Sequence, residues 1–228
     1  QNMVEYVKNF GEEQGLETIV DETGNVIIKK KATPGMENLK TVVLQSHLDM
    51  VPQKNSDKDH DFEKDPIVAY VDGDWVTADG TTLGADNGIG IAATMAVLAS
   101  KDMKHGPVEG LFTVDEETGM TGANNLKPGY LDAEILINMD SEDEGELYVG
   151  CAGGIDITAS KKYKEEPVPE GMKAYRIDAK GMKGGHSGID IPLERANANQ
   201  VLFRFLMHAE ADLDIKLASA GGGDLRNA

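Results

Sequence analysis

Apolar and polar residues alternate along the first 150 positions with the periods of strands and helices. Short apolar runs predict buried strands, and the candidate strands are 17–20, 25–30, 41–46, 108–114, 133–139 and 145–150. Helical spacing of apolar side chains predicts helices over 3–14 and 87–100. A hairpin is expected over 67–78, with its turn at Asp72-Gly73-Asp74. Strands that alternate with helices indicate an α/β fold with a doubly wound, mostly parallel sheet and helices on both faces.

The pattern changes after Cys151. Segments 154–164 and 173–181 alternate apolar with polar residues, as strands with one wet face do, and an amphipathic helix is predicted over 191–209. We therefore expect two domains, 1–151 and 152–228, the second being an antiparallel α+β domain.

Composition and charge narrow the function classes. The chain has 228 residues, 40% of them hydrophobic, and a formal net charge of −18. This charge argues against nucleic acid and anionic membrane surfaces, which both attract Lys and Arg. No apolar stretch approaches the roughly 18 residues that span a bilayer. Cys151 is the only cysteine, so no intrachain disulfide can form, and a reducing cytoplasm is the expected compartment.

Acidic and imidazole side chains lie directly after three predicted strands and directly before one predicted helix. His47 and Asp49 follow strand 41–46; the other members of the set are Asp86 before helix 87–100, Asp115, Glu116 and Glu117 after strand 108–114, and Asp140 after strand 133–139. The carboxyl ends of parallel strands meet at one edge of a sheet, where active sites of α/β proteins lie. The sequence therefore predicts that these groups converge.

Each group alone has a structural explanation. His47 could be a hydrogen-bonded core histidine and Asp86 a helix N-cap. Together, however, several carboxylates in one crevice would raise each other's pKa unless a cation neutralised them. One imidazole and several carboxylates suit a divalent ion such as zinc, manganese or cobalt. Neighbouring Glu116 and Glu117 point opposite ways in extended chain, so one is expected to bind metal and the other to accept a proton. Asp49 would hold His47 through its second ring nitrogen.

Several motifs resemble those of the metallopeptidase family of aminoacylases, carboxypeptidase G and cytosolic dipeptidases. They are "SHLDMVP", "GADNG", "DEETG" and "NMDSE", in that order, followed by "GCAGGID" and "GGHSG". The chain looks like the N-terminal half of a bacterial dipeptidase of this family. The resemblance implies a zinc-peptidase-like catalytic domain over 1–151 and part of an inserted lid domain over 152–228.

The resemblance also implies roles for single residues. Asp86 would bridge two divalent ions, with zinc preferred over manganese or cobalt. His47 and Asp140 would complete one metal's ligands, Glu117 would bind the other metal, and Glu116 would be the general base. A cis peptide bond would follow Asp86. From the lid, His186 would polarise the scissile carbonyl, and Asn227 would contact the substrate, a small peptide such as an Xaa-His dipeptide. The family includes homodimers, so a homodimer is one expected state.

One ligand of the family pattern has no match. The family uses a second histidine from far downstream, and His60, His105 and His208 stand in other contexts. The chain is therefore expected to be an incomplete, inactive fragment of a longer protein. Two alternatives stay open: another amide hydrolase of the family, either an N-acyl amino acid deacylase or a tripeptidase, and a non-catalytic metal-binding fragment. A nucleotide site and a serine hydrolase are disfavoured, because the chain has neither G-x-G-x-x-G spacing nor a G-x-S-x-G elbow.

Overall fold

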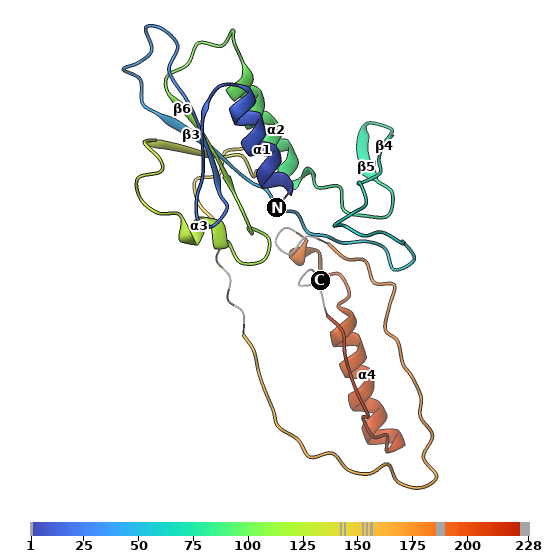
Figure 1. The fold of residues 1–228 in the computed structure, drawn as a ribbon. Coiled ribbons are helices and arrows are strands. Elements are labelled where there is room, and N and C mark those ends of the chain that lie inside the picture. Colours follow the sequence, from blue (N-terminus) through green and yellow to red (C-terminus); the bar gives the residue numbers. More distant parts are fainter. Residues whose placement is uncertain are drawn as a thin grey trace. The chain divides into compact units, whose positions relative to one another are not determined.

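A computed structural model describes most of the chain (Figure 1). The described residues are 2–141, 143, 145–151, 153, 155, 157–185 and 190–223. The chain divides into two compact units, and the division falls after residue 154. No helix in the described residues has the length and apolar composition needed to cross a bilayer.

A five-stranded mixed sheet forms the first unit. Its strands, in spatial order, are β1 (Glu17–Val20), β2 (Val26–Lys30), β6 (Val108–Thr113), β3 (Val42–His47) and β7 (Ile135–Asn138). β6, β3 and β7 are parallel, whereas β2 is antiparallel to both β1 and β6. The α/β class is confirmed. The β1–β2 pair is antiparallel because the short turn between these strands can only close a hairpin.

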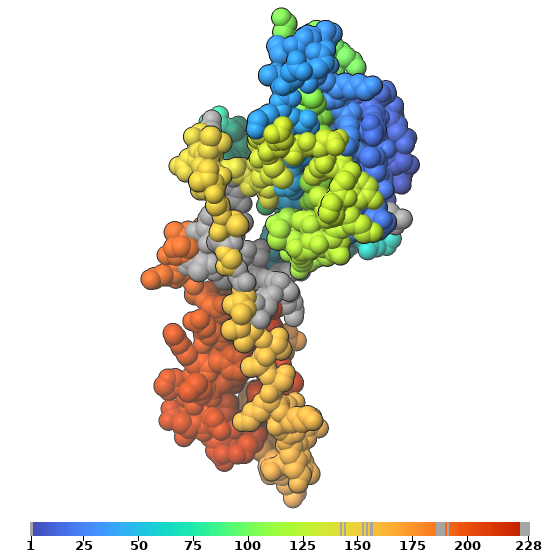
Figure 2. All heavy atoms as spheres, turned by 90° about the vertical axis from the view of Figure 1, so that its left-hand side faces the viewer, coloured from blue at the N-terminus to red at the C-terminus, as the bar shows by residue number. Residues whose placement is uncertain are grey.

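Both faces of the sheet are covered, by different means. Helices α1 (Asn2–Glu13) and α2 (Ala85–Ala99) lie on one face (Figure 1), where Val7, Ile91 and Leu98 join the main core. On the other face, α3 (Thr121–Asn125), which the sequence analysis did not predict, precedes a segment over 126–133 that packs on Leu111 and Val43. This segment lies at the surface on the side that Figure 2 shows. All six residues of β6 are buried, so this strand is the centre of the core.

The predicted hairpin is present as a separate two-stranded sheet. It consists of β4 (Ala69–Asp72) and β5 (Trp75–Ala78), and every residue of β4 is exposed. Trp75 is 78% exposed and Val71 75%. The hairpin therefore adds little to the core.

The second unit contains a short 3-10 turn, η1 (Ile191–Leu193), and one long helix, α4 (Ala198–Leu213). The Asn197 side chain caps α4 by accepting a hydrogen bond from the N–H of Gln200 at 3.1 Å. The strands predicted over 145–150, 154–164 and 173–181 are wrong for the described residues of those segments, which carry no strand. Alternation alone does not make a strand, because a strand needs a hydrogen-bonded neighbour.

Candidate metal centre

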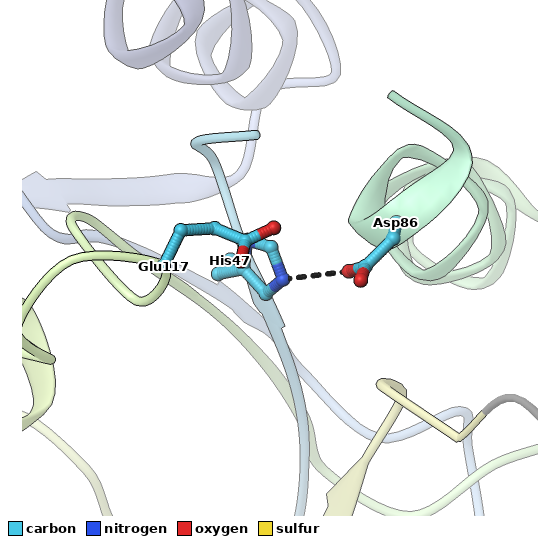
Figure 3. Close-up of side chains that lie close together, drawn as sticks. All are labelled: His47, Asp86 and Glu117. Carbon is cyan, nitrogen blue, oxygen red and sulfur yellow. Dashed lines mark hydrogen bonds and ion pairs between the residues drawn. The ribbon is translucent and has the colours of Figure 1, made fainter. Parts of the chain in front are cut away.

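His47 is the centre of the cluster that the sequence predicted. It is the last residue of β3, whereas the sequence analysis placed it directly after the strand. Its side chain is 1% exposed. Its Nε2 lies 2.9 Å from Asp86 Oδ1 and 3.6 Å from Asp140 Oδ1. Figure 3 shows Asp86 and Glu117 reaching His47 from two different segments. The predicted convergence of these residues is therefore observed.

Asp86 stands at the start of α2 but outside its regular geometry. The preceding Gly84 has a left-handed φ of 77°, and Asp86 and Asn87 have non-helical dihedrals. The peptide bond between Asp86 and Asn87 is cis, as the resemblance implied. This backbone lets the Asp86 carboxylate face His47 rather than cap the helix, which has no side-chain N-cap bond.

Glu116 and Glu117 lie in the loop after β6, and Asp49 anchors this loop. The two carboxylate oxygens of Asp49 accept hydrogen bonds from the main-chain N–H groups of Glu116 and Glu117, each at 3.0 Å. The ring Nδ1 of His47 lies 2.9 Å from the Asp49 carbonyl oxygen and 3.5 Å from its carboxylate. Asp49 therefore contacts His47 mainly through its main chain, while its carboxylate holds the glutamate loop.

Asp140 follows β7 and is oriented by two asparagines. The side-chain amide of Asn87 donates to Asp140 Oδ1 at 2.5 Å and to the Met139 carbonyl at 3.2 Å. The N–H of Asp140 donates to Asn138 Oδ1 at 2.9 Å. Neither asparagine was singled out from the sequence. The only local signal was a polar residue, Asn87, at the start of a predicted helix of small and apolar residues.

Asn25 is a third residue that the sequence analysis did not identify. It is fully buried, and its amide donates to Asp21 Oδ2 at 2.7 Å and to the Gly122 carbonyl at 3.0 Å. Its Oδ1 accepts a hydrogen bond from the N–H of Val114 at 3.2 Å. Since Val114 and Gly122 flank the loop of Glu116 and Glu117, Asn25 holds the two ends of that loop together.

The donor atoms form two overlapping groups that could hold a divalent ion. His47, Asp86 and Glu117 make one group, and His47, Glu116 and Asp140 make the other; in each, the candidate atoms lie within 4.8 Å of one another. Nitrogen and carboxylate oxygen donors at this spacing suit zinc and similar ions. The residues present therefore fit a metal centre.

The pKa values indicate excess negative charge in the cluster. Burial lowers the pKa of His47, but Asp140, Asp49 and Asp86 outweigh it and raise that pKa to about 11. Burial and nearby carboxylates raise the pKa of Asp86, Glu116 and Glu117, although His47 opposes this. A bound cation would relieve this repulsion.

The pKa values of the two remaining carboxylates, Asp140 and Asp49, are lowered. The close contact with His47, whose Nε2 lies 3.6 Å from Asp140 Oδ1, lowers the pKa of Asp140. Burial raises the pKa of Asp49, but His47 and the N–H groups of Glu116 and Glu117 lower it to about 2. Asp49 thus stays ionised while it anchors the loop.

His60, His105 and His208 belong to neither donor group among the described residues. His60 is buried and packs edge-on against Phe62 with ring centroids 4.6 Å apart, the ring of His105 lies 2.7 Å from the Gly106 carbonyl, and His208 is exposed on α4. His186 and Asn227 lie outside the described residues.

A cavity of about 270 Å³ adjoins the cluster. Asp86 and Glu117 line one part of it, and Met50, Val51 and Leu83 line another. The cavity thus places apolar walls beside two of the candidate metal ligands.

Comparisons with known proteins agree with this geometry. Residues 43–216 match the family described as peptidase family M20/M25/M40. The chain is 54% identical to the cytosol non-specific dipeptidase of Escherichia coli over all of this chain and 47% of that protein. Its fold is similar to the crystal structure of aminoacylhistidine dipeptidase from Vibrio alginolyticus, with 53% identity and a TM-score of 0.66 over all of this chain and 46% of that one.

A more distant similarity links it to aminopeptidase PepT from Bacillus cereus, with 26% identity and a TM-score of 0.51 over 61% of this chain and 37% of that one. The chain spans about half the length of the two dipeptidases.

Proposed function

This chain belongs to peptidase family M20/M25/M40, and from that premise we infer that it supplies the metal-binding part of a metal-dependent dipeptidase. The observation that carries the proposal is the group of His47, Asp86, Glu116, Glu117 and Asp140 at the edge formed by β3, β6 and β7. Residues 1–151 would form the catalytic part, and residues 152–228 would belong to a lid.

Two divalent ions, zinc being preferred over manganese or cobalt, fit the donor set. Asp86 would bridge them, His47 and Asp140 would hold one, and Glu117 the other. When bound, such ions polarise a carbonyl and make water more acidic.

Glu116 would be the general base. It would accept the proton of the attacking water and later deliver it to the leaving amine. Its pKa, raised by burial and by neighbouring carboxylates, supports this assignment, because a base works best with a pKa near the operating pH. Asp49 would keep Glu116 in place through the main-chain hydrogen bond. His186 of the lid would polarise the scissile carbonyl, and Asn227 would contact the substrate.

The proposed substrates are dipeptides, including the Xaa-His type. The names of the E. coli and Vibrio relatives support this class. The apolar walls of the cavity at Met50, Val51 and Leu83 would suit an uncharged substrate side chain. The cytosol in the name of the E. coli relative supports a cytoplasmic location, and a homodimer is the proposed assembly.

Two experiments test the proposal in sequence. Zinc content and calorimetric zinc binding of the 228-residue chain test the metal centre, with a His47→Ala/Asp86→Ala double variant as the control. A chimera, in which residues 1–228 replace the matched part of the E. coli dipeptidase, tests the activity. We expect it to hydrolyse Xaa-His dipeptides faster than tripeptides or N-acetyl amino acids. Faster cleavage of either competitor would assign the chain to the tripeptidases or the deacylases instead, and zinc binding without any hydrolysis would support a non-catalytic role.

A further inference from the structure

The side chain of Asn87 connects two candidate metal ligands. Asn87 directly follows Asp86 in the chain, and its amide binds the Asp140 carboxylate at 2.5 Å. The residue is 4% exposed. Both of its acceptors, Asp140 Oδ1 and the Met139 carbonyl, carry no proton to donate, so the NH₂ group must face them. One residue thus sets the distance between the segment of Asp86 and the segment of Asp140.

This orientation leaves the amide oxygen of Asn87 without a partner among the described residues. A buried unsatisfied oxygen is costly. The oxygen of Asn87 thus stays unpaired while its N–H groups bind Asp140 and Met139. Such an arrangement is typical of a residue that serves a functional site and not stability.

Gly90 makes the space that Asn87 occupies. A Cβ at position 90 would lie 2.8 Å from the Met139 carbonyl oxygen and 2.9 Å from Asn87 Cγ, and it would overlap Asn87 Oδ1. Real Cβ atoms do not come under 3.0 Å of such atoms, so the Asn87 amide would have to move. Gly88, in the same helix, has no atom within 4 Å of the position that its Cβ would take.

We propose that Asn87 and Gly90 are positioning residues for Asp140: Gly90 provides the space in which the Asn87 amide fixes the Asp140 carboxylate toward His47. The inference rests on the metal centre proposed above. Residues that orient metal ligands typically contribute 10- to 100-fold to metal affinity. Displacing the amide would free the Asp140 carboxylate to rotate, although Asp140 itself is unchanged.

The test measures Co²⁺ binding by the 228-residue chain, by calorimetry and by the visible absorption of the bound ion. Gly90→Ala should weaken Co²⁺ binding about tenfold or more, and Asn87→Ala should do the same. The matched control Gly88→Ala should change the Kd less than about twofold, because its methyl group meets open space. In the metal-free chain, the side-chain amide signals of Asn87 in a ¹⁵N spectrum should shift in Gly90→Ala and stay in place in Gly88→Ala.

A double variant separates positioning from a general loss of fold. If Gly90 acts through Asn87, then Gly90→Ala should weaken Co²⁺ binding much less in the Asn87→Ala background than in the parent chain. Should Gly90→Ala fail to fold, Asn87→Ala decides the matter alone. Co²⁺ affinity within about twofold of the parent in Asn87→Ala would overturn the inference and leave the metal centre standing. A parent chain that binds no Co²⁺ and no Zn²⁺ would overturn the metal centre and the inference with it.

Discussion

The carboxylate of Asp49 accepts a hydrogen bond from the main-chain N–H of Glu116 at 3.0 Å, across 67 positions of sequence. Asp49 lies two residues after His47, so one short segment delivers the imidazole and also fixes the backbone of the proposed base. The positions of the proposed base, Glu116, and of the candidate ligand, His47, are therefore linked through the main chain. This link does not depend on a contact between their side chains.

Replacing Asp49 with Asn should destabilise the metal-free chain by about 1–3 kcal/mol. An amide keeps one acceptor and turns an NH₂ group toward either the Glu116 or the Glu117 N–H, which leaves a partly buried donor unpaired. Urea unfolding followed by circular dichroism would measure the loss. Asp72→Asn on the exposed hairpin is the control and should stay within about 0.5 kcal/mol of the parent. An Asp49→Asn chain as stable as this control would contradict the anchoring role.

Glu116→Gln should separate metal binding from turnover in the chimera described above. The amide cannot accept the proton of the attacking water, so kcat should fall by a factor of about 10²–10⁴. Metal content should stay near that of the parent if Glu117, His47, Asp86 and Asp140 hold the ions. Steady-state kinetics and metal analysis of the same preparation provide both readouts. A near-normal kcat would remove Glu116 from the role of general base.

Asn25→Ala should destabilise the chain by about 2–4 kcal/mol. The change leaves the Val114 N–H and the Gly122 carbonyl without their side-chain partner, and each buried unpaired group costs about 1–3 kcal/mol. Asn124→Ala is a matched control, because the Asn124 amide makes only an exposed hydrogen bond, 3.3 Å from the Gly119 carbonyl. Chemical unfolding of the two variants side by side would test the prediction. Equal stabilities would show that Asn25 does not brace the loop.

The ion pairs of Lys29 predict a loss of stability at high pH. The hydrogen bond with Asp132 raises the pKa of Lys29, burial opposes this, and buried Glu109 adds to the rise. A raised folded-state pKa stabilises the fold while pH is below the ordinary lysine value of about 10.4, and this contribution is lost as pH rises through the folded-state pKa.

The measurement compares the parent with Asp132→Asn between pH 8 and pH 12. Because Asp132 is 74% exposed, the difference in unfolding free energy should be at most about 1 kcal/mol at pH 8. It should shrink toward zero as pH rises through the raised pKa of Lys29. A difference that grows with pH would have the wrong sign for this ion pair.

The convergence of the site could be predicted from sequence because it depends on strand ends. β6, β3 and β7 are parallel, so residues after each strand must meet at one edge. That rule predicted which side chains converge, whereas the role of each ligand was implied by the family resemblance. In the first unit, helix and strand limits followed the apolar pattern to within a few residues. The helix expected over 191–209 is instead α4, Ala198–Leu213. The described residues between 145 and 164 show where the apolar pattern is insufficient, because their alternation has no neighbouring strand to pair with.

The residues that orient the ligands could not be found in the same way. Asn25 and Asn87 act through contacts with Gly122 and Asp140, 97 and 53 positions away. Such contacts exist only after the sheet and helices have been placed. Gly90 and Gly88 are equally small in the sequence, and only the positions of the Asn87 side chain and the Met139 carbonyl distinguish them.

The exposed β4–β5 hairpin has a practical consequence for spectroscopy. Trp75 is the only tryptophan of the chain, and it lies on the hairpin with 78% of its surface in solvent. The tryptophan emission should already be red-shifted in the native protein and should change little on denaturation. Intrinsic fluorescence would then be a poor probe of folding, and a blue shift would instead report that another molecule had covered the hairpin.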